Sequence, residues 1–277
     1  GLRSYDREMP EEINRVLTDH ISTFLFCPTK TAVKNLQKEG FANIVNNGKL
    51  IPSDVSHFTS HVSRLTSHVS PLVINVGDVM YESALYNLKI AKRKSKILQT
   101  LNLTPKNYIL ATVHRAENTD NPERLKGIFD SFIELSKKGE KLVIPLHPRT
   151  EKALAQISVN LTNYLRNNSL KVIKPVSYLD MLILESNAKL IITDSGGVQK
   201  ESYFFKVPCV TLRDRTEWVK TVESGWNVLV GADKEKILNV SRFTSHVSRS
   251  PSHVSQNIFG DGKTAEKIIE FVEGIIS

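Results

Sequence analysis

Short apolar runs alternate with amphipathic stretches along most of this chain of 277 residues. Runs of a few residues that are apolar throughout are typical of strands buried on both faces, and the stretches between them repeat at helical spacing. This alternation predicts an α/β fold whose parallel sheets are covered on both faces. The predicted strands are residues 24–27, 73–76, 108–113, 141–146, 171–173, 190–193, 209–212 and 227–230.

The stretches between the strands carry clear helix signals. Pro10 stands at the first position of one predicted helix, with two acids behind it, and Gly40 closes the next one. A long helix is predicted over 78–96 and an amphipathic helix over 263–276 at the end of the chain. The helix that begins after Asn121 has the most regular apolar stripe. Its members are Leu125, Ile128, Phe129, Phe132 and Ile133.

The apolar run at 190–192 stops at Thr-Asp-Ser-Gly-Gly (193–197), and a helix-compatible stretch follows at once. The unpaired N–H groups and the positive dipole end of a helix start attract phosphate. Gly196 and Gly197 allow an anion to approach the backbone, and Ser195 can cap the helix. Glu201, about one turn further on, can accept hydrogen bonds from sugar hydroxyls. An ordinary strand-to-helix turn is the alternative interpretation, because the segment is neither a G-x-G-x-x-G fingerprint nor a P-loop.

Basic residues follow three more of the predicted strands. In chain order they are His114 with Arg115, then His147, and then Arg213. Ligands of parallel α/β sheets bind beyond the carboxyl ends of the strands. A single basic residue after a strand is usually an ordinary loop residue. Together with the Ser-Gly-Gly turn, however, these four basic residues predict a site for a pyrophosphate group.

Two polar segments interrupt the pattern. Residues 56–70 and 241–255 match at twelve of fifteen positions and hold five of the eight histidines. A metal-binding histidine repeat is one interpretation, but a metal site needs converging ligands and supporting partners that these segments lack. Ser/Thr/His tracts bury little apolar surface, so we expect two mobile surface insertions with no metal.

Composition narrows the class of protein. Apolar content of 40% and charged content of 24% are typical of a globular protein, and no run of the sequence is long enough to span a membrane. Cys27 and Cys209 lie in separate apolar runs, which favours two buried thiols in the cytoplasm. The net charge of +8 raises nucleic-acid binding as an alternative. Apart from the run at 89–96, the basic residues are dispersed, and a site for a doubly charged sugar nucleotide explains part of the excess.

Seven motifs carry a family resemblance. They are GLRSYDREMPEEINR (1–15), VGDVMYESAL (76–85), ATVHRAEN (111–118), PLHPRT (145–150), ITDSGGVQKES (192–202), LRDRTEWVKTVESGWNVLVG (212–231) and FGDGKTAEKI (259–268). In combination they resemble the non-hydrolysing UDP-N-acetylglucosamine 2-epimerases. Apart from the two polar repeats, the resemblance covers nearly all of the chain.

The resemblance implies a GT-B-like fold of two Rossmann-like domains. Residues 1–95 match the end of the first domain, with an insertion at about 53–71, and that domain is expected to be incomplete. Residues 96–262 match a complete second domain that binds UDP, with an insertion at about 241–255. Residues 263–277 match a helix that packs back on the first domain. Roughly the first third of the family's chain precedes the GLR motif, so an N-terminal truncation is expected.

The resemblance also implies a chemistry and roles for residues. The family interconverts UDP-N-acetylglucosamine and UDP-N-acetylmannosamine by eliminating UDP and adding it again, without a cofactor or a metal, for the synthesis of surface-polysaccharide precursors. Glu11 matches an acid–base carboxylate, and His114 matches the histidine beside the leaving diphosphate. The matching substrate-binding positions are Arg115, His147, Ser195, Gly196, Gly197, Glu201 and Arg213.

The missing family residues limit what this chain is expected to do. Inversion at C2 needs acid–base groups on both faces of the sugar, and Glu11 alone cannot supply both. We therefore expect this chain by itself to be inactive, although the full-length family is expected to act as a cytoplasmic homodimer. A UDP-sugar-binding remnant without catalysis is the main alternative, followed by a GT-B glycosyltransferase. Neither nucleic acid nor a membrane is an expected partner.

Overall fold

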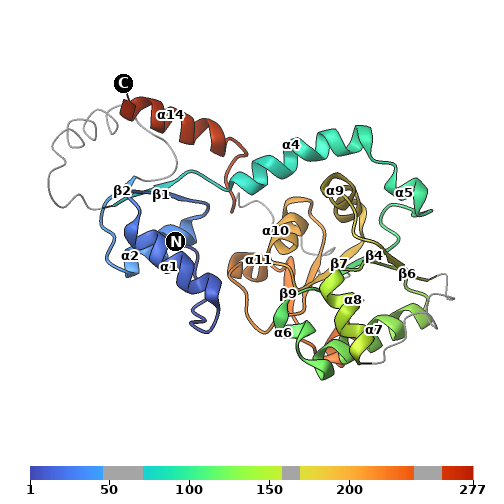
Figure 1. The fold of residues 1–277 in the computed structure, drawn as a ribbon. Coiled ribbons are helices and arrows are strands. Elements are labelled where there is room, and N and C mark those ends of the chain that lie inside the picture. Colours follow the sequence, from blue (N-terminus) through green and yellow to red (C-terminus); the bar gives the residue numbers. More distant parts are fainter. Residues whose placement is uncertain (46–70, 158–168, 240–257, 277) are drawn as a thin grey trace. The chain divides into compact units, whose positions relative to one another are not determined.

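The computed structural model describes residues 1–45, 71–157, 169–239 and 258–276 (Figure 1). The chain forms two compact units. The first comprises Gly1–Leu85 with Gln256–Ser277, and the second comprises Tyr86–Ser255. The repeats at 56–70 and 241–255, expected to be insertions, lie outside the described residues. One boundary between the two units along the chain falls between Leu85 and Tyr86. The domain division expected at residue 95 stays a prediction.

The first unit is built on a three-stranded parallel sheet with helices on both faces. Leu36 belongs to the cluster on one face, together with residues of the first strand. Phe271 lies against the other face, where its ring meets Phe24 and Phe26 edge-on, with centroids 5.3 and 5.6 Å away. The sheet order is β1 (Phe24–Cys27), β3 (Leu72–Asn75) and β2 (Ile44–Val45), and the two helices are α2 (Lys30–Lys38) and α14 (Thr264–Ile276).

A further helix, α1 (Pro10–Ile21), belongs to the first unit, and α4 (Val79–Lys94) begins in the first unit and continues into the second. α1 has Pro10 at its first position, as the sequence indicates. α4 begins after Asp78, whose carboxylate accepts a hydrogen bond of 2.8 Å from the N–H of Met80. α4 is also joined to α14, because Glu82 accepts a bond of 2.7 Å from the N–H of Ala265.

The second unit contains a six-stranded parallel sheet in which the strand order reverses at the centre. The chain first builds outward from β4 through β5 to β6. It then returns to the other side of β4 with β7 and continues to β8 and β9. The sheet order is therefore β6 (Leu170–Ile173), β5 (Leu142–Pro145), β4 (Ile109–Thr112), β7 (Leu190–Thr193), β8 (Cys209–Thr211) and β9 (Asn227–Leu229).

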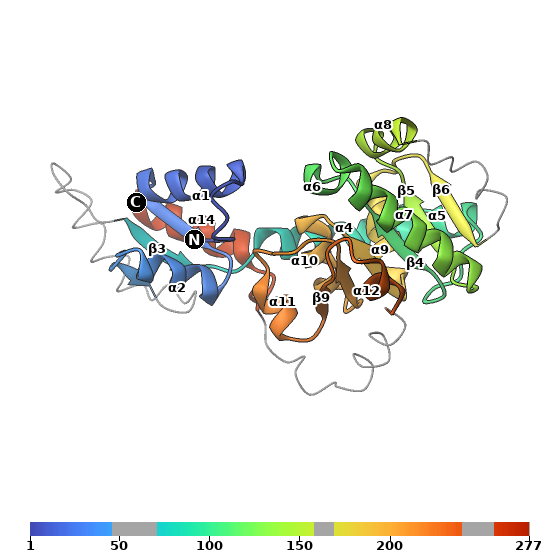
Figure 2. The ribbon, with the colours of Figure 1, turned by 90° about the horizontal axis from the view of Figure 1, so that it is seen from below.

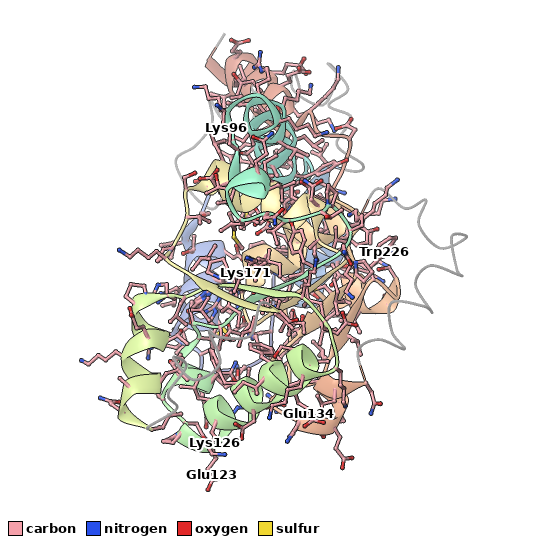
Figure 3. All side chains as sticks on the ribbon, turned by 90° about the vertical axis from the view of Figure 1, so that its right-hand side faces the viewer. Lys96, Glu123, Lys126, Glu134, Lys171 and Trp226 are labelled. Atoms are coloured by element: carbon pink, nitrogen blue, oxygen red, sulfur yellow. The ribbon has the colours of Figure 1, made fainter. Side chains whose placement is uncertain are left out.

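Successive residues of the central strand enter different hydrophobic clusters. Ile109 and Ala111 pack with the apolar stripe of α7, whereas Leu110 packs with residues of α9 and α10. α7 lies on the opposite side of the sheet from α9 and α10 (Figures 1 and 2). The outer face of α7 carries Glu123, Lys126 and Glu134, which point away from the sheet (Figure 3). The helices are α5 (Ile97–Thr100), α6 (Ala116–Thr119), α7 (Pro122–Lys137), α8 (Pro148–Gln156), α9 (Tyr178–Asn187), α10 (Gly196–Phe204), α11 (Val219–Glu223) and α12 (Lys234–Leu238).

The observed elements confirm the α/β class with parallel sheets. Every predicted strand is present, mostly with ends shifted by one residue, and all five members of the stripe on α7 are buried. β2 was not predicted, because two residues are too few to show a pattern. Among the described helices, none is both long and apolar enough to cross a membrane.

Candidate functional site

The candidate site lies where the strand order of the six-stranded sheet reverses. β4 and β7 are neighbours, and the helices that follow them, α7 and α10, pack on opposite faces of the sheet. Thr112 and Thr193 end the two strands, and their hydroxyl groups are 2.6 Å apart. In open parallel sheets this reversal point, beyond the carboxyl ends of the strands, is where ligands bind.

The segment after β7 forms a capped helix start, as predicted. Ser195 precedes α10, and its hydroxyl accepts a hydrogen bond of 3.4 Å from the N–H of Val198. The backbone N–H of Ser195 itself bonds to the hydroxyl of Thr193 at 2.9 Å. Gly196 and Gly197 open the helix, and no acidic residue lies in its first turn. This helix start therefore keeps its positive dipole end without a competing carboxylate on the same helix.

A carboxylate from the next loop lies against the first glycine of α10. A Cβ atom added to Gly196 would stand 2.7 Å from Oε1 of Glu217 and 3.4 Å from Nε1 of Trp218. The other carboxylate oxygen, Oε2 of Glu217, is 3.0 Å from Nη1 of Arg213, and both side chains are more than nine-tenths buried. Arg213, predicted as a basic contact for the ligand, is thus already paired next to the helix start.

The loop after β4 is fastened to the end of β7 by Asp194, which is fully buried. Its carboxylate accepts hydrogen bonds from the backbone N–H of His114 at 3.0 Å and from that of Arg115 at 2.9 Å. It also accepts one from the side-chain amide of Asn118 at 3.0 Å. The two candidate residues His114 and Arg115 are therefore held beside the Ser-Gly-Gly turn.

The imidazole of His114 is partly buried, and its surroundings favour the neutral form. Burial lowers the pKa of His114 below its ordinary value, and Asp194 partly opposes this effect. His147, Arg115 and Arg149 each lower the pKa further, because they repel a second positive charge. The His147 ring lies 5.5 Å from the His114 ring, centroid to centroid, and its Nδ1 accepts a bond from the N–H of Arg149 at the start of α8.

Glu201 lies in a buried acidic pair one turn into α10. Burial raises the pKa of its carboxyl, while a hydrogen bond of 3.0 Å from the Tyr178 hydroxyl and the charge of Lys200 oppose the rise. The pKa of Glu185 is raised well above its ordinary value by complete burial and by the nearby Glu201. Within the described part of the chain, neither carboxyl oxygen of Glu185 has a hydrogen-bond partner. Glu201 is therefore an acceptor whose ionisation is already disfavoured.

The predicted acid–base residue Glu11 belongs to the first unit, in the first turn of α1, where its side chain is exposed. The next residue, Glu12, is buried and accepts hydrogen bonds of 3.0 Å from the N–H groups of Ser4 and Tyr5. Burial by itself would raise the pKa of Glu12, but these bonds and Arg15 lower it to about 2. Glu12 thus fixes the loop before α1, where Tyr5 has a left-handed φ of 59°.

No group of three His, Cys, Asp or Glu side chains in the described ranges is arranged to hold a metal ion. Cys27 and Cys209 are free and buried. Burial raises the pKa of the Cys27 thiol to about 11 and that of Cys209 to about 12, so both thiols are protonated at neutral pH.

The second unit brings most of the predicted residues to one edge of its sheet, and two residues there, Asp194 and Glu217, are not among those predicted. His114, Arg115, Ser195, Gly196 and Arg213 lie around Asp194 and Glu217. The sequence shows Asp194 only as part of the turn and Glu217 only as part of a motif. A buried carboxylate needs N–H or guanidinium partners, which is the one signal that could have pointed to either residue. The partners of Asp194 are distant in the sequence, however, and the partner of Glu217 is evident only in the fold. The role of Glu12 was missed because its neighbour Glu11 matched the motif.

Comparison with known proteins shows which family this chain is similar to. A family model described as UDP-N-acetylglucosamine 2-epimerase matches residues 1–273. A UDP-N-acetylglucosamine 2-epimerase homolog from Methanococcus maripaludis is 50% identical over 99% of this chain and 67% of its own length. A UDP-2,3-diacetamido-2,3-dideoxy-D-glucuronate 2-epimerase from Pseudomonas aeruginosa is 39% identical over 98% of this chain and 66% of its own length.

A solved structure shows the same likeness in three dimensions. The crystal structure of the Methanocaldococcus jannaschii UDP-GlcNAc 2-epimerase in complex with UDP-GlcNAc and UDP matches with a TM-score of 0.77 and 41% identity. The match covers 99% of this chain and 67% of that chain. The chain thus spans about two thirds of the length of the relatives it matches.

Proposed function

Because the chain belongs to the UDP-N-acetylglucosamine 2-epimerase family, whose members are isomerases, we propose that its second unit binds the UDP part of UDP-N-acetylglucosamine and of UDP-N-acetylmannosamine. One observation carries the proposal. His114 is hydrogen-bonded to Asp194, just before the glycine start of α10, at the point where the strand order reverses. The backbone N–H groups of two glycines at a helix start, together with a histidine, suit a diphosphate. We propose that the two units are the Rossmann-like halves of a GT-B fold.

The proposed reaction removes the proton at C2 and breaks the bond between C1 and the diphosphate oxygen, whose electron pair leaves with UDP. UDP then adds again at C1, and C2 receives a proton on the opposite face. Negative charge develops on the departing diphosphate, so donors held in place before the reaction lower the barrier. In this proposal Ser195, Gly196 and Gly197 bind the diphosphate, and His114 donates to the leaving oxygen.

The remaining proposed contacts are to the ribose and the diphosphate of the nucleotide. Glu201 accepts hydrogen bonds from the ribose hydroxyls, in place of the one that it accepts from Tyr178. His147 and Arg115 lie near the diphosphate on the side of β4 and β5. Arg213 contributes positive charge behind the glycines, and its pairing with Glu217 holds it there.

Proton transfer at C2 is proposed for Glu11, but it needs a second positioned group. Each positioned acid or base contributes roughly 10²–10⁴-fold to the rate. Because Glu11 is the only carboxylate among the candidate residues with this role, we expect the 277-residue chain alone to bind UDP without measurable epimerisation. A non-catalytic UDP-sugar-binding protein is the second candidate, and the same argument supports it.

Calorimetry of the full 277-residue chain with UDP and with uridine tests the binding proposal. UDP should bind at least tenfold more tightly, because charge-assisted contacts contribute about 1.5–3 kcal/mol each. Equal affinities would contradict a diphosphate site. Incorporation of solvent deuterium at C2, followed by NMR, tests catalysis. UDP-N-acetylglucosamine and the diacetamido-glucuronate nucleotide should be compared, since a relative at 39% identity is described as acting on the latter.

A further inference from the structure

The carboxylate of Asp194 is the most completely buried charged group of the site. It stands directly after β7 and has no exposed surface. All the donors that the structure gives it come from the segment after β4, namely the N–H groups of His114 and Arg115 and the amide of Asn118. A buried carboxylate is tolerated only when such bonds replace its water, so this segment is fixed to the end of β7.

Asn118 extends the connection to a third strand end. Its amide nitrogen donates to Asp194 and also to the backbone oxygen of Leu212, both at 3.0 Å. Leu212 directly follows β8, so the ends of β4, β7 and β8 are joined through two buried side chains. The backbone of His114 therefore has little freedom to move relative to the start of α10.

The same carboxylate also faces the His114 ring. Oδ1 of Asp194 is 3.6 Å from Nδ1 of His114, which is within ion-pair range but longer than a hydrogen bond. An ionised carboxylate can only accept hydrogen bonds, so the tautomer of His114 with hydrogen on Nδ1 is favoured. Nε2 then carries the lone pair, or a second proton when the ring is charged.

The other charged and titratable groups around the ring act in the opposite direction. Arg115 is on the same loop, and His147 and Arg149 come from the segment after β5. All of them disfavour an imidazolium, as does burial. Among these groups of the described residues, Asp194 is the one that favours the imidazolium.

We propose that Asp194 is the positioning residue of the site, which holds His114 with Nδ1–H towards its carboxylate and leaves Nε2 to meet the diphosphate. The inference rests on the proposed function for the identity of the ligand, but the link between Asp194 and His114 does not. When the diphosphate binds, its negative charge favours a second proton, taken from solvent, on Nε2; Asp194 stabilises the imidazolium that results, so that Nε2–H can donate to the leaving oxygen. Asp194 acts through His114 and does not itself touch the ligand.

The first test uses the wild-type chain without ligand. ¹⁵N NMR of histidine-labelled protein, with His114→Gln to assign the signal, should show neutral His114 protonated on Nδ1. Its pKa should fall in Asp194→Asn and recover partly in Asp194→Glu. A wild-type ring protonated on Nε2, or a titration that Asp194→Asn leaves unchanged, would overturn the proposal whether or not UDP is the ligand.

The second test measures binding. Asp194→Asn should weaken UDP roughly tenfold or more, the loss typical of removing a group that orients a binding side chain, while uridine affinity stays the same. The change should add nothing in a His114→Gln background, because both affect one contact. The matched control is Asp214→Asn, which alters an exposed carboxylate paired with Arg124 and should leave both affinities unchanged.

The two tests separate the possible failures. Equal losses of UDP and uridine would make Asp194 a merely structural residue and refute the proposal. If Asp194→Asn does not fold, the tautomer of the wild-type ring decides the question alone. If the wild-type chain does not prefer UDP to uridine, the proposed function fails, whereas the NMR result still stands or falls by itself.

Discussion

Replacing Gly196 by alanine tests the geometry at the start of α10 most directly. The added Cβ would lie 2.7 Å from Oε1 of Glu217, closer than real Cβ contacts. Glu217 cannot turn away freely, since its other oxygen pairs with the buried Arg213 at 3.0 Å. Either the methyl group displaces the pair or the helix start shifts.

The expected loss combines two opposing terms. Overpacking a filled site costs about 1–3 kcal/mol. Gly196 does not have a left-handed φ, so alanine also gains about 0.4–1 kcal/mol from a stiffer unfolded chain. At the midpoints of the two ranges the net destabilisation is about 1.3 kcal/mol, which should lower Tm by roughly 3–5 °C. A shifted helix start would also move the N–H groups that the diphosphate contacts in the proposal, so UDP affinity should fall about tenfold.

Differential scanning calorimetry and UDP titration measure the two effects. Gly127→Ala is the matched control, because its Cβ would meet only the backbone oxygen of Ala232, at an ordinary 3.6 Å inside α7. That change should keep Tm or raise it slightly and should leave UDP binding unchanged. If Gly196→Ala behaves like Gly127→Ala in both measurements, the packing of Glu217 against the glycine is wrong.

Three further outcomes are expected. Glu12→Gln should destabilise the first unit by about 1–3 kcal/mol at pH 7, since its folded pKa of about 2 lies below the ordinary value of 4.5. This stability is present above the unfolded pKa and is lost as the pH falls towards 2, so denaturant titrations of wild type and variant should converge in acid; a constant gap would contradict the role. Arg213→Ala should weaken UDP at least tenfold and lower Tm, because Glu217 is left buried without its cation; unchanged UDP affinity in calorimetry would remove Arg213 from the site. Cys27 and Cys209 should both resist a thiol reagent in the native chain and react after denaturation, as their raised pKa values require; fast native labelling would show that one of them is accessible.

The strands and the apolar helix stripes could be predicted because burial determines which neighbouring residues of the sequence are apolar. The run at 190–192 is apolar throughout because alternate residues face different helices, and the helix cap follows within a few residues. Asn121 and Ser195 cap their helices through bonds that span two or three positions. Such short-range chemistry can be recognised without a structure.

The partners of the site residues could not be predicted in the same way. Asp194 binds the N–H of a residue 80 positions earlier in the chain, and only the sheet order brings the two together. Arg213 is a cation by sequence, but its pairing with Glu217 depends on how one loop folds. Glu11 and Glu12 look alike in the motif, and the path of the residues before α1 decides which of them is buried.

The pairing of β4 with β7 has a consequence for how the protein folds. β5 and β6 lie between these neighbours in the sequence, so the site depends on a strand pairing of long sequence separation, a kind that slows folding. A nascent chain that ends before Leu190 can form β4 but has no anion site. The N–H groups of His114 and Arg115 are protected by Asp194, so their hydrogen exchange should report when this strand closes the sheet.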